Sequence, residues 1–155
     1  MAGGTVLIAY DGSPGAANAI TKAASLFGAH KAVVVSVWSP VPVETVAYGA
    51  TTDFAPAAPA YFGDLEPALE RQAGETAEQG ARIAREAGLD AEPRTASAGD
   101  AWRGVVETAE AVDAGVIVVG ARGLSGLKSA LLGSTSSAVL HHTKRPVLVI
   151  QQPEV

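Results

Sequence analysis

Residues 5–38 read TVLIAYDGSPGAANAITKAASLFGAHKAVVVSVW, and this stretch decides the fold. It begins and ends with short apolar runs, Thr5–Tyr10 and Ala32–Trp38, which are rich in β-branched residues. Such runs are typical of parallel strands that are buried on both faces. Between them, Ser13-Pro14 is a helix start and Gly28 is a helix stop, with apolar residues at helical spacing. The stretch therefore predicts a strand, a helix and a second strand parallel to the first.

Three further runs of strand length follow, at 92–97, 115–120 and 146–150. The last two are unbroken apolar runs and resemble the first pair. Glu92–Ser97 is weaker, because its polar and apolar residues alternate and it contains Pro93, so we expect it at a sheet edge or near one.

Helical patterns separate these strands, with expected N-caps at Asp64, Asp100 and Ser134, and the last helix is expected to end near His142. Strands that alternate with helices predict an α/β fold, a doubly wound parallel sheet with four helices on its two faces. In such sheets ligands bind beyond the carboxyl ends of the strands. A functional site is therefore expected in the loops after the first and fourth strands.

Residues 39–63 depart from this alternation. They form a long connection that is rich in proline and alanine and contains Tyr48, Phe54, Tyr61 and Phe62. Connections longer than about 12–15 residues are usually functional or disordered. We expect a long flexible loop, which is either a mobile surface segment or a lid or partner-binding flap.

The composition limits the function further. The 155 residues suit one domain, and 48% hydrophobic with 17% charged residues is typical of a globular protein. The net charge of −5 argues against a nucleic-acid partner, and the lack of cysteine excludes disulfides, thiolate metal sites and a cysteine nucleophile. No apolar run approaches the ~18 residues of a membrane span, and no export signal is recognisable. We therefore expect a cytoplasmic protein without a membrane partner.

The chemically richest segment follows the fourth strand and reads GARGLSGLKSALLGST over residues 120–135. Its glycines let backbone N–H groups approach a ligand, and the helix that opens near Gly133 offers N–H groups and a positive dipole end to an anion. Hydroxyl groups and the positive charges of Arg122 and Lys128 add to what we interpret as a phosphate cradle. The spacing fits neither a Walker loop nor the dinucleotide fingerprint. A plain turn before a capped helix is the alternative.

The spacing Gly120-x2-Gly123-x9-Gly133-Ser134 is similar to the nucleotide-binding pattern of the universal stress protein family. Further segments resemble that family in the same order along the whole chain, namely Ile8–Ser13, Gly99–Ala101, Val116–Gly120 and Pro146–Ile150. The resemblance implies a single-domain Rossmann-like sandwich over residues 1–155, with a five-stranded parallel sheet in the order 3-2-1-4-5. It also implies a homodimer and, because the glycine pattern is kept, the ATP-binding branch of the family.

Carried over residue by residue, the resemblance implies an ATP site with three parts. The backbone of Val37 would contact adenine. The ribose would meet the backbone of Ala9, the carboxylate of Asp11 and Gly120. The phosphates would meet Gly123, Gly133, Ser134 and Thr135, with Arg122 within reach, and a magnesium ion would bridge them. For Asp11 the alternative is a turn in which its side chain bonds its own backbone.

No pattern in the sequence predicts a catalytic or metal-ligating residue. His141 and His142 are adjacent and point apart on a helix, so they are expected at its C-terminus rather than on a metal. We expect a nucleotide-dependent stress-response or regulatory protein with at most slow ATP hydrolysis. Pro146–Ile150 is expected to be an edge strand that pairs with a second copy. The alternatives are a nucleotide-free dimeric interaction module and a slow ATPase.

Overall fold

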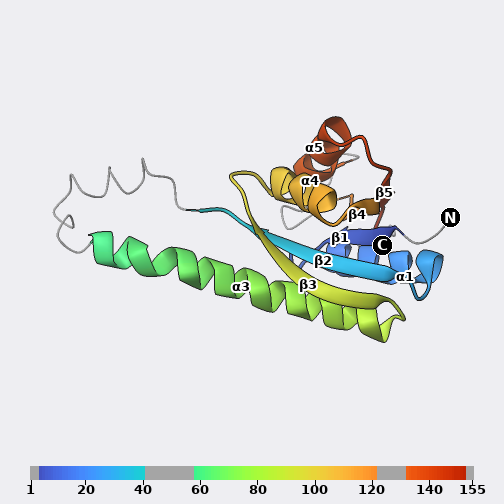
Figure 1. The fold of residues 1–155 in the computed structure, drawn as a ribbon, viewed down its shortest axis with the longest axis horizontal. Coiled ribbons are helices and arrows are strands. Elements are labelled where there is room, and N and C mark those ends of the chain that lie inside the picture. The colour runs from blue at the N-terminus through green and yellow to red at the C-terminus, as the bar shows by residue number, and fades with distance from the viewer. Residues whose placement is uncertain (1–3, 41–57, 122–131, 153–155) are drawn as a thin grey trace.

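The computed structural model describes residues 4–40, 58–121 and 132–152 (Figure 1). Strands and helices alternate along the chain as the sequence predicts. In order they are β1 (Thr5–Ala9), α1 (Pro14–Phe27), β2 (Lys31–Trp38), α3 (Ala58–Glu86), β3 (Asp90–Ser97), α4 (Ala101–Ala111), β4 (Ala114–Gly120), α5 (Ser134–His142) and β5 (Val147–Ile150).

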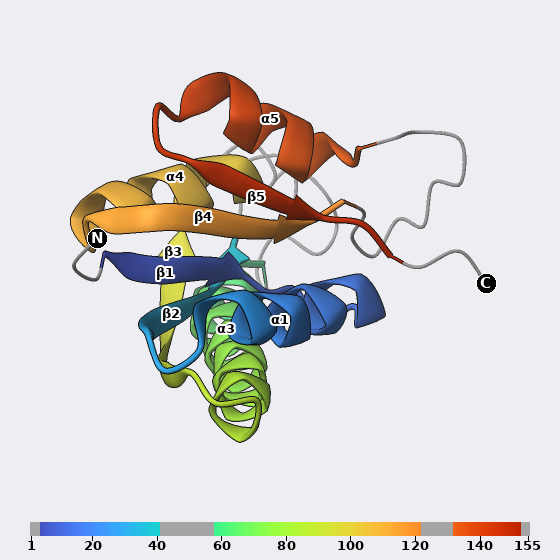
Figure 2. The same cartoon turned by 90° about the vertical axis from the view of Figure 1, so that its right-hand side faces the viewer.

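The strands form one five-stranded sheet in the order β3-β2-β1-β4-β5. All of its pairs are parallel, so the predicted fold and strand order are confirmed. Helices α1 and α3 cover one face of the sheet, and α4 and α5 cover the other (Figure 2). After β1 the chain forms β2 and β3 on one side of β1 in the sheet, and it then crosses back to form β4 and β5 on the other side. The boundary between β1 and β4 is therefore the switch point of the topology.

The core lies on both faces of the sheet, because successive side chains along a strand point to opposite faces. In β1, Val6 and Ile8 pack on the side of α1 and α3, whereas Leu7 packs with Val35 and Val105 on the side of α4. All of these side chains are buried. This double burial explains why the central strands are unbroken apolar runs. The more polar β3 occupies the sheet edge, as predicted.

Helix α3 differs from the prediction at its start. It begins at Ala58, so Asp64 lies inside the helix and does not cap it, and the connection ends at residue 57 rather than at 63. The physical reason is that Pro59, which argued for a loop, falls in the first helical turn, where proline is tolerated. The rest of the expected loop, residues 41–57, lies outside the described residues. Helix α3 extends well past the carboxyl ends of the strands (Figure 1).

The helix caps agree with the sequence in part. The Ser13 hydroxyl caps α1 by accepting a hydrogen bond from the Ala16 N–H at 3.1 Å. Asp100 occupies the N-cap position of α4, but its side chain bonds no backbone N–H there. The N-cap of α5 is Gly133 and not Ser134, which is the first helical residue. This difference of one residue leaves the Ser134 hydroxyl without a capping role.

The end of α5 lies against the beginning of α4. The ring of His142 stacks on that of Trp102, with centroids 3.9 Å apart and planes inclined by 21°. The Nδ1 atom of His142 is 2.8 Å from the carbonyl oxygen of Ala138, in the last turn, as expected for a residue at the helix C-terminus. Trp102 thus packs as a structural side chain. Among the helices of the described segments, none has both the length and the apolarity for crossing a bilayer.

Candidate functional site

A cavity of about 520 Å³ opens at the carboxyl ends of the strands. The ends of β1, β2 and β4 form its floor, and the first turns of α1, α4 and α5 and one face of α3 surround it. Its volume is ordinary for a small-molecule site, and it lies at the β1–β4 switch point, where doubly wound sheets bind ligands.

The structure brings most of the predicted site residues together around this cavity. Those that line it are Ala9, Asp11, Val37, Gly120, Gly133, Ser134 and Thr135. The remaining predicted residues, Arg122 and Gly123, lie outside the described part of the chain. The structure therefore shows that the residues share one cavity, while their roles as ligand contacts stay predictions.

The turn after β1 places Asp11 at the cavity. Gly12 has a φ of 85°, a left-handed conformation that favours glycine, and the Oδ1 atom of Asp11 accepts the Ser13 N–H at 2.9 Å. The turn interpretation of Asp11 is thus confirmed. The side chain is nevertheless exposed on the cavity, and its Oδ2 atom has no hydrogen-bond partner among the described residues. One carboxylate oxygen holds the turn while the other is available to a ligand.

Strand β2 continues past the end of β1 and exposes backbone groups there. The Tyr10 N–H donates to the Val35 carbonyl at 2.9 Å, and beyond this bond β1 turns away. Along a strand, the N–H and C=O groups of successive residues point alternately to its two neighbouring strands. The Trp38 carbonyl points to the β3 side, where it accepts from the Ala98 N–H at 3.1 Å. The N–H and C=O of Val37 therefore face the side that β1 has left, where the cavity lies.

Three helices begin at the cavity, and they differ in what they offer to an anion. Helix α1 is capped by Ser13, and α4 is preceded by the carboxylate of Asp100. Helix α5 is preceded by Gly133, which has no side chain to cap the first N–H groups. The N–H groups of its first turn have no capping side chain among the described residues, and together with the positive dipole end they favour an anion at this start over the other two.

A buried hydroxyl holds the start of α5 against β4. The Oγ atom of Ser136 lies 3.1 Å from the Gly133 carbonyl oxygen and 3.3 Å from that of Ala121, which directly follows β4. The hydroxyls of Ser134 and Thr135 line the cavity and have no hydrogen-bond partner among the described residues. These two hydroxyls are free to donate to a ligand.

The charge at the cavity is sparse. Asp11 is the only carboxylate among the described lining residues, and no lysine, arginine or histidine is among them. Burial of the neighbouring Tyr10, and secondly the charge of Asp11, raise the pKa of the Tyr10 phenol. Within the described segments, no three potential metal-binding side chains cluster. Because the described lining offers a single carboxylate and no cluster of metal ligands, a magnesium ion at this cavity would be held mainly by the phosphates of a ligand.

Several lining residues were not predicted from the sequence. One group comes from α3, namely Leu69, Gln72, Ala73 and Thr76, and a second comes from α4, namely Ala101 and Val105. Their periodic spacing is visible in the sequence, but it indicates only that one side of each helix packs inward. Which of these positions lies over the cavity depends on where each helix crosses the sheet edge.

Comparison with known proteins identifies the family of this chain. The family model of the universal stress protein family matches residues 4–151. The chain belongs to this family. A universal stress protein of Thermus aquaticus is 30% identical over 151 residues, which are 95% of this chain and 98% of that protein. A universal stress protein of Synechocystis sp. is 43% identical over 53 residues, so that the match spans 34% of each protein.

Solved structures, several of them of universal stress proteins, share the fold. The hypothetical protein MJ0577 has a TM-score of 0.77 at 19% identity, with 98% of both chains covered. A universal stress protein in complex with cAMP has a TM-score of 0.62 at 27% identity and covers 97% of this chain and 98% of its own. The universal stress protein from Archaeoglobus fulgidus in complex with dAMP has a TM-score of 0.55 at 23% identity, over 95% of this chain and 96% of that one.

Proposed function

We propose that this universal stress protein binds ATP in the cavity at the carboxyl ends of β1, β2 and β4. The observation that carries the proposal is the distribution of free groups around the cavity. Among the described residues, N–H and hydroxyl groups without partners lie at the start of α5, and the N–H and C=O of Val37, near the end of β2, are unpaired. Asp11 follows β1, the strand that lies between β2 and β4 in the sheet.

In this proposal, each part of ATP meets the chemistry that suits it. The N–H and C=O of Val37 bond the base edge, which has both an acceptor and a donor. The free Oδ2 atom of Asp11 accepts from the ribose hydroxyls, beside Ala9 and Gly120. The start of α5, with Gly133 and the hydroxyls of Ser134 and Thr135, holds the phosphates, and Arg122 and Gly123 belong to the same part of the proposal. Magnesium bound with the phosphates supplies the positive charge that the described lining lacks.

The relatives support a nucleotide of this kind. The structure at 27% identity is a complex with cAMP, an adenine nucleotide. A mononucleotide with the same base thus binds to a protein that shares this fold over nearly the whole chain. The third phosphate and the metal of ATP go beyond that complex and are specific to the present proposal.

We further propose a regulatory rather than a catalytic role, in the cytoplasm. ATP hydrolysis requires a group that orients the attacking water, and the described lining offers only the Asp11 carboxylate, which the proposal assigns to the ribose. Any hydrolysis is therefore slow. Strand β5 forms the edge of the sheet, and an edge strand of this kind can pair with the same strand of a second copy. A homodimer joined through Pro146–Ile150 is the expected assembly.

The test is to denature freshly purified protein and identify any released nucleotide by mass spectrometry, and then to titrate the stripped protein calorimetrically with ATP and magnesium. Released ATP or ADP, or saturable binding, is the expected result. No nucleotide and no heat of binding up to millimolar ATP would overturn the proposal. That outcome would leave a nucleotide-free interaction module whose glycine-rich segment only turns the chain.

A variant pair tests the phosphate assignment. Gly133→Val places a branched side chain at the start of α5, where the phosphates are proposed to bind, and we expect ATP affinity to fall by about tenfold or more. Gly99→Val is the matched control, because Gly99 is exposed, has no atom within 4 Å of an added Cβ, and does not line the cavity. Equal affinities of the two variants would refute the phosphate assignment, and a thermal melt of each variant monitors its folding.

A further inference from the structure

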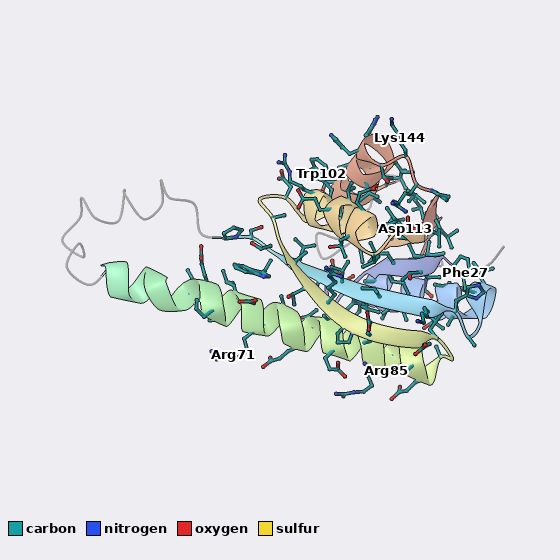
Figure 3. All side chains as sticks on the ribbon, in the orientation of Figure 1. Phe27, Arg71, Arg85, Trp102, Asp113 and Lys144 are labelled. Carbon is teal, nitrogen blue, oxygen red and sulfur yellow. The ribbon has the colours of Figure 1, made fainter. Side chains whose placement is uncertain are left out.

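One face of α3 forms a wall of the cavity beyond the end of the sheet. Leu69, Gln72, Ala73 and Thr76 follow the spacing i, i+3, i+4 and i+7, which places them on one side of the helix. Nearer the sheet the same helix buries Gly80 against the side chains of Tyr10 and Val34. The neighbouring Arg71 points away from the body of the protein (Figure 3). The core-facing side of α3 thus continues outward and faces the cavity.

This wall lies at the end of the cavity that is remote from the start of α5. Helix α3 packs on β2 and β3, whereas α5 follows β4 on the other side of β1. The Cβ position of Gly74 is 4.0 Å from a methyl of Thr95 in β3, which confirms this placement. With phosphates at α5, the part of a nucleotide that reaches α3 is the base. Ala101 and Val105 of α4 line the cavity at the same end from the other face of the sheet.

Gln72 is the side chain in this wall that is free to select a base. Its amide has no hydrogen-bond partner among the described residues. The nearby hydroxyls are already engaged: that of Thr76 donates to the Gln72 carbonyl at 3.0 Å, and that of Ser36 donates to the Tyr10 carbonyl at 2.7 Å. A glutamine amide offers one donor group and one acceptor. Adenine presents the complementary pair, the N7 acceptor and the N6 donor, whereas guanine presents two acceptors, N7 and O6.

We infer that α3 is the base-recognition wall of this site and that Gln72 selects adenine over guanine. The inference rests on the proposed function, since it requires a nucleotide whose phosphates lie at α5. It adds a side-chain contact to a base that would otherwise be read by the backbone of Val37 alone. The amide donates from Nε2 to N7 and accepts from the N6 amino group through Oε1.

The decisive experiment compares Gln72→Leu with Gln79→Leu by calorimetric titration with ATP and with GTP. Gln79 is a matched control, because it is an exposed glutamine two turns further along α3 that does not line the cavity. We expect Gln72→Leu to lower ATP affinity by about five- to tenfold while GTP affinity is unchanged, and Gln79→Leu to resemble the wild type. An unchanged ATP-to-GTP affinity ratio in Gln72→Leu would overturn the selection by Gln72.

A second pair tests the wall itself. Ala73 is buried and lines the cavity, so Ala73→Leu adds bulk where the base is placed, and binding of ATP and of GTP should fall by about tenfold or more. Ala68→Leu adds the same bulk at an exposed position of α3 outside the cavity lining, and should leave both affinities unchanged. If wild-type and Ala73→Leu proteins bind ATP equally well, α3 is not the wall. If the wild type binds neither nucleotide, the proposed function itself fails.

Discussion

The close approach of α3 to the sheet depends on Gly80, and Gly80→Ala tests this directly. A Cβ atom at this position would lie 2.6 Å from the Cδ1 atom of Tyr10 and 2.7 Å from the Cγ1 atom of Val34. Both neighbours are core side chains, with 4% and 0% of their surfaces exposed, so neither can move aside freely. We therefore expect α3 to be displaced or the core to be strained in this variant.

The magnitude follows from two opposing effects. Replacing glycine by alanine inside a helix stabilises it by about 1 kcal/mol. Overpacking a core costs about 1–3 kcal/mol, and contacts below 3.0 Å with two rigid neighbours belong in the upper half of that range. The net expectation is a loss of about 1–2 kcal/mol of unfolding free energy. For a chain of this length, the midpoint of thermal unfolding should fall by about 3–6 °C.

Gly74→Ala in the same helix provides the control. Its added Cβ would meet only a methyl of Thr95 at 4.0 Å, so the helix-propensity gain remains and the midpoint should rise by about 2–4 °C. Calorimetric or circular-dichroism melts of both variants and the wild type measure the effect. If both substitutions stabilise the protein equally, the close contact of α3 with Tyr10 and Val34 is wrong. The placement of the cavity wall would then be wrong as well.

Three further expectations follow from the same structure. Gly104→Ala would bring a Cβ atom within 2.7 Å of both methyl groups of Val37. We therefore expect lower stability in urea titration and weaker ATP binding. Wild-type stability together with wild-type ATP affinity would contradict the packing of α4 on Val37. The hydrogen bonds from Arg145 hold the pKa of the Glu110 carboxyl below its usual 4.5. The Arg145–Glu110 pair therefore stabilises the fold fully above pH 4.5, and this contribution is lost as the pH falls through the lowered pKa. Glu110→Gln should therefore lower stability at about pH 7, and this difference should shrink as the pH falls below 4.5 in urea titrations; a pH-independent difference would rule this out. Burial raises the pKa of the Tyr10 phenol above 10.0. The contribution of the neutral phenol to stability is therefore complete below pH 10.0 and is lost as the pH rises through the raised pKa. Tyr10→Phe should reduce the loss of stability at alkaline pH, and an unchanged alkaline stability profile would contradict this role of Tyr10.

The sequence predicted the sheet well, because the central strands are buried on both faces and must be apolar throughout. The weaker strand with Pro93 was correctly placed at an edge, since proline cannot donate to a central ladder. The start of α3 was predicted wrongly at Asp64. Proline is found both in loops and in first helical turns, so Pro59 does not distinguish them without the rest of the fold.

The sequence predicted the site only in part. Residues after β1 and β4 could be named, because the carboxyl ends of parallel strands lie at one edge and these segments carry glycines and an acidic turn. The cap of α5 was misplaced by one residue. Short polar residues follow one another there, so the local sequence does not distinguish them. The Ser136 hydroxyl, which bonds the Ala121 carbonyl beyond β4 as well as the Gly133 carbonyl in the same turn, fixes the start of the helix against the sheet.

The sequence by itself determined the order of strands and helices, the burial of the strands and the edge at which a site could form, because these depend on local periodicity and on the handedness of connections. Only the tertiary structure decided that Gln72 and Ala73 lie over the cavity. Their position depends on how far α3 runs past the sheet and how closely it packs, which Gly80 permits by lacking a Cβ atom against Tyr10 and Val34. Such a contact joins residues that are distant in the chain, and no local pattern encodes it.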